Sequence, residues 1–307
     1  MADNRRINSI DIARLLAAIL VVAIHTQAIT WFSGYSNGSV QILTRVAVPF
    51  FFCTSGYFLH KNYTNRGFPA IAATFWKTVK LYFVLSLVYF TVVFLSAPAL
   101  LHESKKWMLV DFLLNGSYYH LWYMVGTVYS IAIIYLVCKL KLMKVLLPLA
   151  VICYAIGLLG TSYYSIGNRL PVLNVLFNSG WFLSIRRIFF MGFPFTALGW
   201  TISQEKLKLH IPKKNLLFAA MLVALLFVAE IIIVTVAGMS RSIEITVFLY
   251  PLLFLLFQIC LAYPIEWKSR LASFCRDTAY FTYFWHPLII LVLRRVVDAN
   301  FLLFVIT

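Results

Sequence analysis

Charged residues are scarce in this sequence of 307 residues. Asp, Glu, Lys and Arg together account for 12% of the chain, whereas 62% of the residues are hydrophobic. A soluble domain typically has about 25% charged and about 45–50% apolar residues. A soluble fold of this length could not hide so much apolar surface, so the composition excludes an ordinary soluble domain and favours a protein that folds in the lipid bilayer.

Acidic residues are the scarcer of the two charged classes, with 10 Asp and Glu against 26 Lys and Arg, a formal net charge of +16. In a soluble domain this excess would suggest a nucleic-acid partner. Here the basic residues lie in short segments between apolar runs, where they act as topology signals and contact anionic lipid headgroups. We therefore expect anionic lipids, and no nucleic acid, among the partners.

Cysteine is also sparse, and its pattern excludes a conventional zinc site. There are five cysteines, an odd number, and no Cys-x-x-Cys spacing occurs. Most lie inside apolar runs and are expected to be small buried hydrophobic residues, so we predict no metal cofactor. The sequence has no internal repeat, low-complexity tract or soluble appendage, and we predict one transmembrane domain over residues 1–307.

Long apolar runs predict membrane-spanning helices, each of roughly 20 mostly apolar residues. Nine runs predict an all-α polytopic bundle. They lie near residues 9–30, 40–60, 75–98, 119–138, 145–162, 181–202, 215–237, 244–263 and 279–303. With the N-terminus in the cytoplasm, 16 Lys and Arg fall on the cytoplasmic side and 6 on the other side. This bias favours a cytoplasmic N-terminus.

Two of the predicted outer connections, residues 99–118 and 163–180, are longer than a turn and carry aromatic and apolar residues. They are either interfacial or re-entrant segments that shape an outer cavity, or ordinary surface loops. The first apolar run is interpreted as a retained helix rather than a signal peptide, because three ionisable residues interrupt it and no small-residue cleavage site follows.

Those three residues are Asp11, Arg14 and His25. Asp11 and Arg14 are three positions apart, so they can pair on one helix face. His25 lies eleven positions after Arg14, which at about 100° per residue returns to within about 20° of the same direction, about 16 Å further along the axis. Near the cytoplasmic boundary, Arg14 suits a phosphate or an acidic partner, and the deeper His25 suits a general base. The alternatives are a structural Asp11–Arg14 ion pair and a packing histidine.

Other polar residues also fall within or beside the predicted spans, where burying a charge costs about 2.5–3.5 kcal/mol. His120 could face a sugar or water, and Glu230 could handle protons or form half of a structural pair. The surroundings of His286 assign it no role. The full set is Arg45, His120, Trp122, Tyr123, Arg186, Arg187, Glu230 and His286.

Several of these residues lie in motifs that resemble the membrane acyltransferase-3 family of bacterial integral membrane proteins. Ile10-Asp11-Ile12-Ala13-Arg14, with ten residues between Arg14 and His25, is similar to the family's Arg-x10-His signature. The segments Arg45–Pro49, Ser55–Tyr57, His120–Tyr123 and Tyr280–Pro287 resemble its later motifs, in the same order along the chain. Each motif alone is weak, but the ordered set is specific.

The resemblance implies O-acyl transfer, usually O-acetyl transfer, from cytoplasmic acyl-CoA to a carbohydrate of the cell envelope. The expected donor is acetyl-CoA, and the expected acceptor is an envelope glycan or lipid-linked saccharide. His25 and Asp11 are the expected catalytic residues, and Arg14 and Arg45 are expected to serve acyl-CoA binding. We assign the remaining polar residues to the acceptor side. Many family members have ten spans, so we expect nine to ten, in the cytoplasmic membrane of a bacterium.

The same signature resembles the membrane portion of vancomycin-resistance serine racemases. On that basis the alternative function is a membrane transporter or sensor of a small solute such as serine, with the buried charges forming the solute site. The sequence does not identify the acceptor, the acyl group or the oligomeric state.

Overall fold

The computed structural model describes residues 7–26, 42–96, 109–205, 207, 209, 211–265, 269–297 and 304–307. All regular secondary structure within these ranges is helical, which confirms the predicted all-α class. Among the described residues, five helical segments are long and apolar enough to cross a membrane. They are α1 (Asn8–Thr26), α3 (Phe68–Ser96), α5 (Trp122–Lys139), α6 (Leu146–Gly160) with the preceding 3-10 turn η4 (Met143–Val145), and α11 (Lys213–Val236).

The other four predicted spans also coincide with helices. They are α2 (Ala47–Arg66), the run α9 (Phe182–Arg186), η5 (Arg187–Gly192) and α10 (Phe193–Ser203), then α12 (Leu249–Ala262), and α13 (Ser269–Leu293). At 14 residues, α12 is about 21 Å long, which is shorter than a bilayer core of about 30 Å. A total of nine spans and a cytoplasmic N-terminus therefore stay predictions. The predicted span ends at 27–30, 40–41, 97–98 and 298–303 lie outside the described residues.

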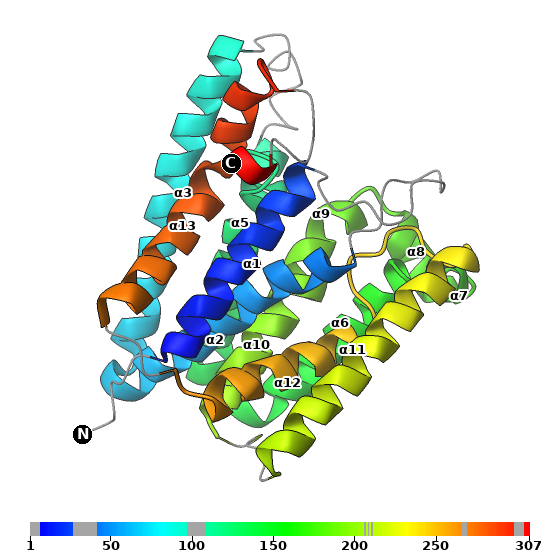
Figure 1. The fold of residues 1–307 in the computed structure, drawn as a ribbon. Coiled ribbons are helices and arrows are strands. Elements are labelled where there is room, and N and C mark those ends of the chain that lie inside the picture. The colour runs from blue at the N-terminus through cyan, green and yellow to red at the C-terminus, as the bar shows by residue number, and fades with distance from the viewer. Residues whose placement is uncertain are drawn as a thin grey trace. The chain divides into compact units, whose positions relative to one another are not determined.

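The chain groups into two compact units, and the division falls inside α2. Unit 1 comprises Met1–Phe51, Leu209–Gly238 and Ser242–Thr307, and unit 2 comprises Phe52–Lys208 and Met239–Arg241. In unit 1, α13 packs along α1, and α12 lies against α11 and also contacts α1 (Figure 1). The helices α1 and α13 run in the same direction. Two spans that run in the same direction must have an odd number of other spans between them. The nine-span prediction meets this condition, because α1 lies in its first span and α13 in its ninth.

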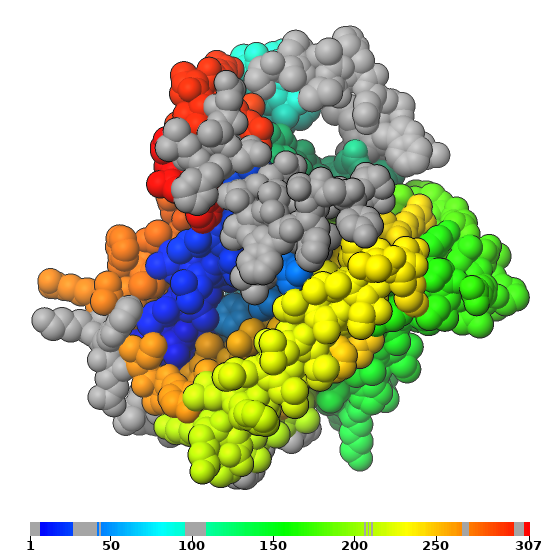
Figure 2. Space-filling model, turned by 45° about the vertical axis from the view of Figure 1, so that its right-hand side comes forward, coloured from blue at the N-terminus to red at the C-terminus, as the bar shows by residue number. Residues whose placement is uncertain are grey.

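The outer face of α11 shows why the bilayer is needed. Helix α11 is the yellow-to-green ridge that crosses the face shown in Figure 2. Its exposed apolar side chains include Phe218, Met221, Leu225, Ile232, Ile233 and Val236. A continuous apolar stripe of this length is stable against lipid and not against water.

In unit 2, α10 is the buried central helix and contacts α5, α6 and η5. Two glycines allow α10 to approach α2 closely. A Cβ at Gly56 would lie 1.8 Å from the Thr196 carbonyl oxygen, and a Cβ at Gly199 would lie 1.8 Å from the Cys53 carbonyl oxygen. Because the two contacts are reciprocal, the α2 and α10 backbones touch over a full turn, as small residues permit in membrane helices.

The predicted outer connection at 163–180 is helical, with α7 (Tyr164–Gly167) and α8 (Pro171–Asn178). Phe177 of α8 is fully buried, whereas Val172 is 82% exposed. The side chain of Arg241 donates to the Phe177 carbonyl at 2.8 Å and lies over the Tyr164 ring. The segment is thus a packed helical element of unit 2, and its placement at the membrane interface stays a prediction. In the other connection, residues 99–108 lie outside the described part, and 111–115 form the π-helix η3 (Asp111–Asn115).

Candidate active site

The candidate site lies along the contact between α1 and α13 in unit 1. The face of α1 that is buried carries small residues, including Ala17, Ala18 and Ala23, which let another helix approach. At the start of α1, the Asn8 amide donates to the Ile265 carbonyl at 2.8 Å, which ties α1 to the segment after α12. The polar side chains of α1 are therefore held against protein.

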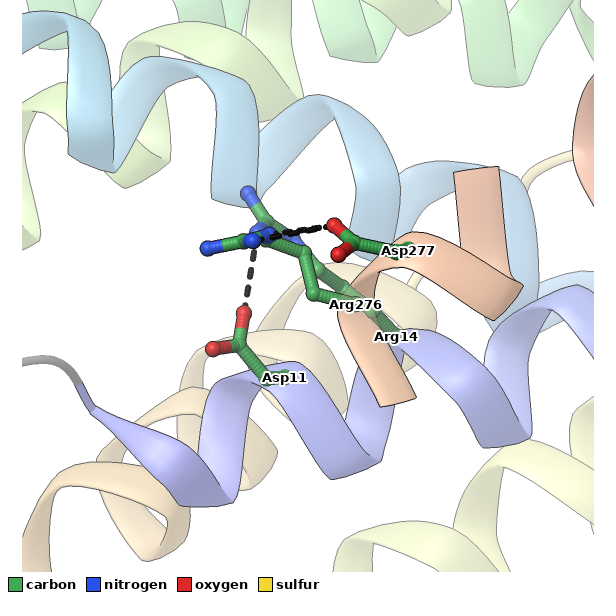
Figure 3. Close-up of polar contacts among 4 residues, drawn as sticks. All are labelled: Asp11, Arg14, Arg276 and Asp277. Carbon is green, nitrogen blue, oxygen red and sulfur yellow. Dashed lines mark hydrogen bonds and ion pairs between the residues drawn. The ribbon is translucent and has the colours of Figure 1, made fainter. Parts of the chain in front are cut away.

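Arg14 and Asp11 form the ion pair that their spacing predicts. The Arg14 Nη1 atom lies 3.1 Å from the Asp11 carboxylate, and the two side chains are only 10% and 7% exposed. The Arg14 guanidinium also lies over the ring of Tyr280 in α13, 5.7 Å from its centre. Figure 3 shows the Arg14 side chain with its Asp11 partner on α1, together with Arg276 and Asp277 of α13. The pairing neutralises a buried charge and turns the guanidinium to the α13 side.

His25, in the last turn of α1, also faces α13. Its imidazole ring stacks on the ring of His286, with centroids 5.1 Å apart and an interplanar angle of 24°. His286 is fully buried. Because Arg14 and His25 both contact α13, they share one face of α1, as the eleven-residue spacing predicted. The structure thus pairs four of the predicted site residues at two places along the α1–α13 contact: Asp11 with Arg14, and His25 with His286.

Arg45 belongs to the same unit, in the 3-10 turn η1 (Leu43–Val46), which contacts α1. Its charge interacts with the carboxylate of Glu244, in the connection between α11 and α12. A role for Glu244 could not be predicted from the sequence, because only folding brings it near a residue so far away along the chain.

The carboxylate of Glu230, in the middle of α11, accepts hydrogen bonds from the backbone of another part of the chain. Its two carboxylate oxygens accept the backbone N–H groups of Val247 at 2.6 Å and Phe248 at 2.9 Å. These amides lie at the start of α12, whose N-cap residue makes no side-chain capping bond of its own. A carboxylate there satisfies amides that have no partner within the helix and complements the positive end of the helix dipole. Of the two readings of Glu230, this geometry favours the structural one.

The other residues that were assigned to acceptor binding all lie in unit 2. The guanidinium of Arg187, the first residue of the π-helix η5, lies over the Trp122 ring at 5.3 Å. The hydroxyl groups of Tyr123 and Ser55 are 2.9 Å apart. Arg186 is the last residue of α9, directly before η5. The structure thus brings together Trp122, Tyr123 and Arg187 where α5 packs on η5.

His120 lies in an aromatic cluster just before α5 and is almost fully buried. Edge-to-face contacts join it to the rings of Tyr89, Tyr118 and Tyr119. The Tyr118 and Tyr89 rings stack at 4.6 Å. Tyrosine rings thus surround much of the His120 imidazole, which leaves little of it to face either a sugar or water.

Two contacts of the site were missed by reasoning from the sequence. Tyr280 was recognised as part of a motif but not as the ring under Arg14. Ser55 was likewise recognised only as part of a motif, although its hydroxyl contacts that of Tyr123 in unit 2.

Comparison with known proteins gives a family match over nearly the whole chain. Residues 7–307 match the acyltransferase-3 family model, which is described as an acyltransferase domain. No solved structure matches.

The curated relatives carry other names. An amino-acid racemase of Enterococcus faecalis is 32% identical over 91% of this chain and 39% of its own length. A second amino-acid racemase of Enterococcus faecalis is 27% identical over 95% of this chain and 42% of its own. A serine/alanine racemase of Enterococcus gallinarum is 28% identical over 71% of this chain and 32% of its own. The chain therefore spans about two-fifths or less of these relatives.

Proposed function

Because the chain belongs to the acyltransferase-3 family, we propose that it is a membrane O-acyltransferase that moves an acyl group from cytoplasmic acyl-CoA to a hydroxyl of a cell-envelope carbohydrate. The donor in this proposal is acetyl-CoA, and the membrane is the bacterial cytoplasmic membrane. The observation that carries the proposal is the α1–α13 contact, where His25 and Arg14 project from the same face of one apolar helix. Ionisable groups at membrane depth usually serve function when they face the protein interior.

In the proposed reaction, His25 is the general base. The acceptor hydroxyl gives its proton to the His25 imidazole while its oxygen attacks the thioester carbonyl. The tetrahedral intermediate collapses as the carbon–sulfur bond breaks, and the departing CoA thiolate takes the proton from the imidazolium. The products are the carbohydrate ester and free CoA. General base catalysis contributes about 10²–10⁴-fold, so positioning of both substrates must supply the rest.

Arg14 and Arg45 are assigned to the donor. A guanidinium matches phosphate groups geometrically and stays charged in any environment. The buried ion pair with Asp11 keeps the Arg14 side chain in one orientation, so Asp11 acts as a positioning residue for Arg14. In this proposal the phosphates of acyl-CoA stay near the basic cytoplasmic segments, and its pantetheine arm extends between helices toward His25.

The acceptor is assigned to the aromatic residues of unit 2. The Trp122–Arg187 contact and the Tyr123–Ser55 hydroxyl pair combine ring faces with hydrogen-bonding groups. Arg186 and His120 extend this set, whereas Glu230 leaves it in favour of its capping role. Stacking of a sugar ring on an aromatic face, with polar groups at the rim, is a general mode of binding in mixed apolar and polar sites.

Inverted membrane vesicles, which expose the cytoplasmic face and retain native acceptors, test the proposal directly. With acetyl-CoA labelled in the acetyl group, vesicles containing the protein should incorporate label into a glycan or lipid-linked saccharide fraction. A His25→Ala variant present at equal abundance should incorporate at least about 10²-fold less. Label incorporation by this variant at the wild-type rate would refute the assigned role of His25.

A second candidate, which the resemblance to serine racemases suggested, is a transporter or sensor of a small solute such as serine; the relatives themselves are named amino-acid racemase and serine/alanine racemase. Proteoliposomes distinguish the two functions. Accumulation of labelled serine without consumption of acyl-CoA would favour the second candidate, whereas acyl-CoA consumption without serine uptake would favour the first.

A further inference from the structure

His286 has a hydrogen-bonding arrangement that sets the protonation of its ring. Its Nδ1 atom lies 2.9 Å from the Thr282 carbonyl oxygen and 3.0 Å from the Tyr283 carbonyl oxygen. A carbonyl oxygen can only accept a hydrogen bond, so Nδ1 must carry the proton. In a neutral imidazole, the lone pair then resides on Nε2.

The next residue, Pro287, explains why this arrangement is available inside a helix. In a regular α-helix, the N–H of residue 287 would donate to the carbonyl of residue 283. Proline has no N–H and cannot do so. Pro287 lies inside α13, and the His286 Nδ1–H donates to this same Tyr283 carbonyl. The His-Pro dipeptide thus replaces a backbone donor with an imidazole donor.

The face of the His286 ring is presented to His25. The two rings are nearly parallel at 5.1 Å. The Tyr283 ring also lies near His286, with centroids 6.3 Å apart, and is 5.9 Å from the Phe51 ring. Hydrogen bonds to two carbonyls and contact with an aromatic ring fix the orientation of the His286 imidazole, so that it can orient a second imidazole stacked on it.

We propose that His286 is the positioning residue for His25, with its tautomer held by the carbonyl that Pro287 leaves without a helical donor. The proposal rests on the assignment of His25 as general base. Stacking fixes the plane of the His25 ring, so that one nitrogen faces the acceptor hydroxyl. When His25 takes up the acceptor proton, the imidazolium lies over a neutral aromatic ring, which attracts a cation. A second positive charge at this distance would oppose proton uptake.

Two single substitutions of His286 separate the effect of ring stacking on His25 from the effect of hydrogen-bond donation by Nδ1. His286→Phe keeps a ring facing His25 and loses the Nδ1 donor, whereas His286→Asn keeps an amide donor and loses the ring. In the vesicle assay, the maximal rate should fall about 10-fold for His286→Phe and about 10²-fold for His286→Asn, within the range for disturbed general base catalysis. The KM for acetyl-CoA should change less than about threefold, because the donor phosphates lie elsewhere in the proposal. An unchanged maximal rate in both variants, or a loss confined to KM, would overturn the proposal.

A measurement without turnover decides the same question if the protein proves not to be an acyltransferase. Nitrogen NMR of histidine-labelled protein in nanodiscs distinguishes protonated from unprotonated ring nitrogens. The His286 signal, assigned by its loss in His286→Phe, should show a protonated Nδ1, and His25 signals should shift when the ring is removed in His286→Asn. In Pro287→Ala, a backbone N–H returns and the Nδ1-protonated population should fall. A protonated Nε2 in the wild-type protein would refute the positioning role independently of activity.

Discussion

At the scale of single residues, the Asp11–Arg14 pair should matter far more for stability than a second ion pair nearby. Asp11→Asn leaves a buried guanidinium without its counter-charge, which typically costs about 3–5 kcal/mol. The matched control is Asp277→Asn. In its pair with Arg276 the side chains are 65% and 29% exposed, and such surface pairs contribute about 0–1 kcal/mol. Figure 3 shows both pairs.

Denaturant unfolding in a bilayer-like medium measures the difference between these two variants. We expect a large decrease in the free energy of unfolding for Asp11→Asn and almost no decrease for Asp277→Asn. Equal effects would mean that the Asp11–Arg14 pair is solvated in the folded protein. Replacing Asp11 and Arg14 together by Leu should be less harmful to stability than Asp11→Asn alone, because no unpaired charge is left.

Glu230 should behave as a structural residue. Glu230→Ala removes the acceptor of two backbone N–H groups at the start of α12 and should destabilise the protein by about 1–3 kcal/mol. Glu230→Gln keeps one carbonyl oxygen and should cost less. Both variants should retain label incorporation at a temperature where they stay folded. A Glu230→Gln protein with full thermal stability and no transfer activity would return Glu230 to the functional residues.

Local geometry made part of the site predictable from the sequence. The Asp11–Arg14 pair and the common face of Arg14 and His25 follow from the helical repeat. The stacking of His25 on His286 does not, because it joins helices from opposite ends of the chain. The same holds for Glu230, whose partners are backbone amides of another helix. Backbone amides carry no signature in the amino-acid sequence.

At the scale of secondary-structure elements, the α2–α10 contact depends on two glycines. In Gly56→Ala and Gly199→Ala, the added methyl group would overlap sterically with a backbone carbonyl oxygen of the opposite helix. The helices would have to separate, at a cost of at least about 1–3 kcal/mol. Gly180→Ala is the control, because a Cβ there meets nothing within 4 Å. The yield of folded, monodisperse protein and its thermal unfolding should drop for the first two variants only. If all three variants behave alike, the two helices do not pack as described.

The elements themselves were largely predictable, because a long apolar run in a bilayer can satisfy its backbone only as a helix. Each of the nine predicted spans coincides with helical structure within the described residues. The interruption of the run at 181–202 by the π-helix η5 was not predictable. A π-turn arises from packing constraints and inserted residues, and the apolar periodicity of the sequence does not encode it.

At the scale of the whole molecule, the distribution of basic residues predicts which ends of the helices face the cytoplasm. Lys144, between α5 and α6, should lie inside the cell, and Gly180, between α8 and α9, outside. In a background without native cysteines, a membrane-impermeant maleimide should label Gly180→Cys in intact cells and Lys144→Cys only in inverted vesicles. The reverse pattern would invert the topology and place His25 in the cytoplasmic half.

The central claim is that His25 removes a proton from a carbohydrate hydroxyl during acyl transfer. The most direct measurement is the mass of envelope glycans from cells that produce the wild-type protein, His25→Gln or His60→Gln at equal abundance. His60 is the matched control, since it is a histidine of α2 that contacts Ser203 and has no part in the proposed reaction. We predict that one glycan carries an acyl mass increment in cells that produce the wild-type protein or His60→Gln, and that no glycan carries it in cells that produce His25→Gln. The same increment in His25→Gln cells would contradict it.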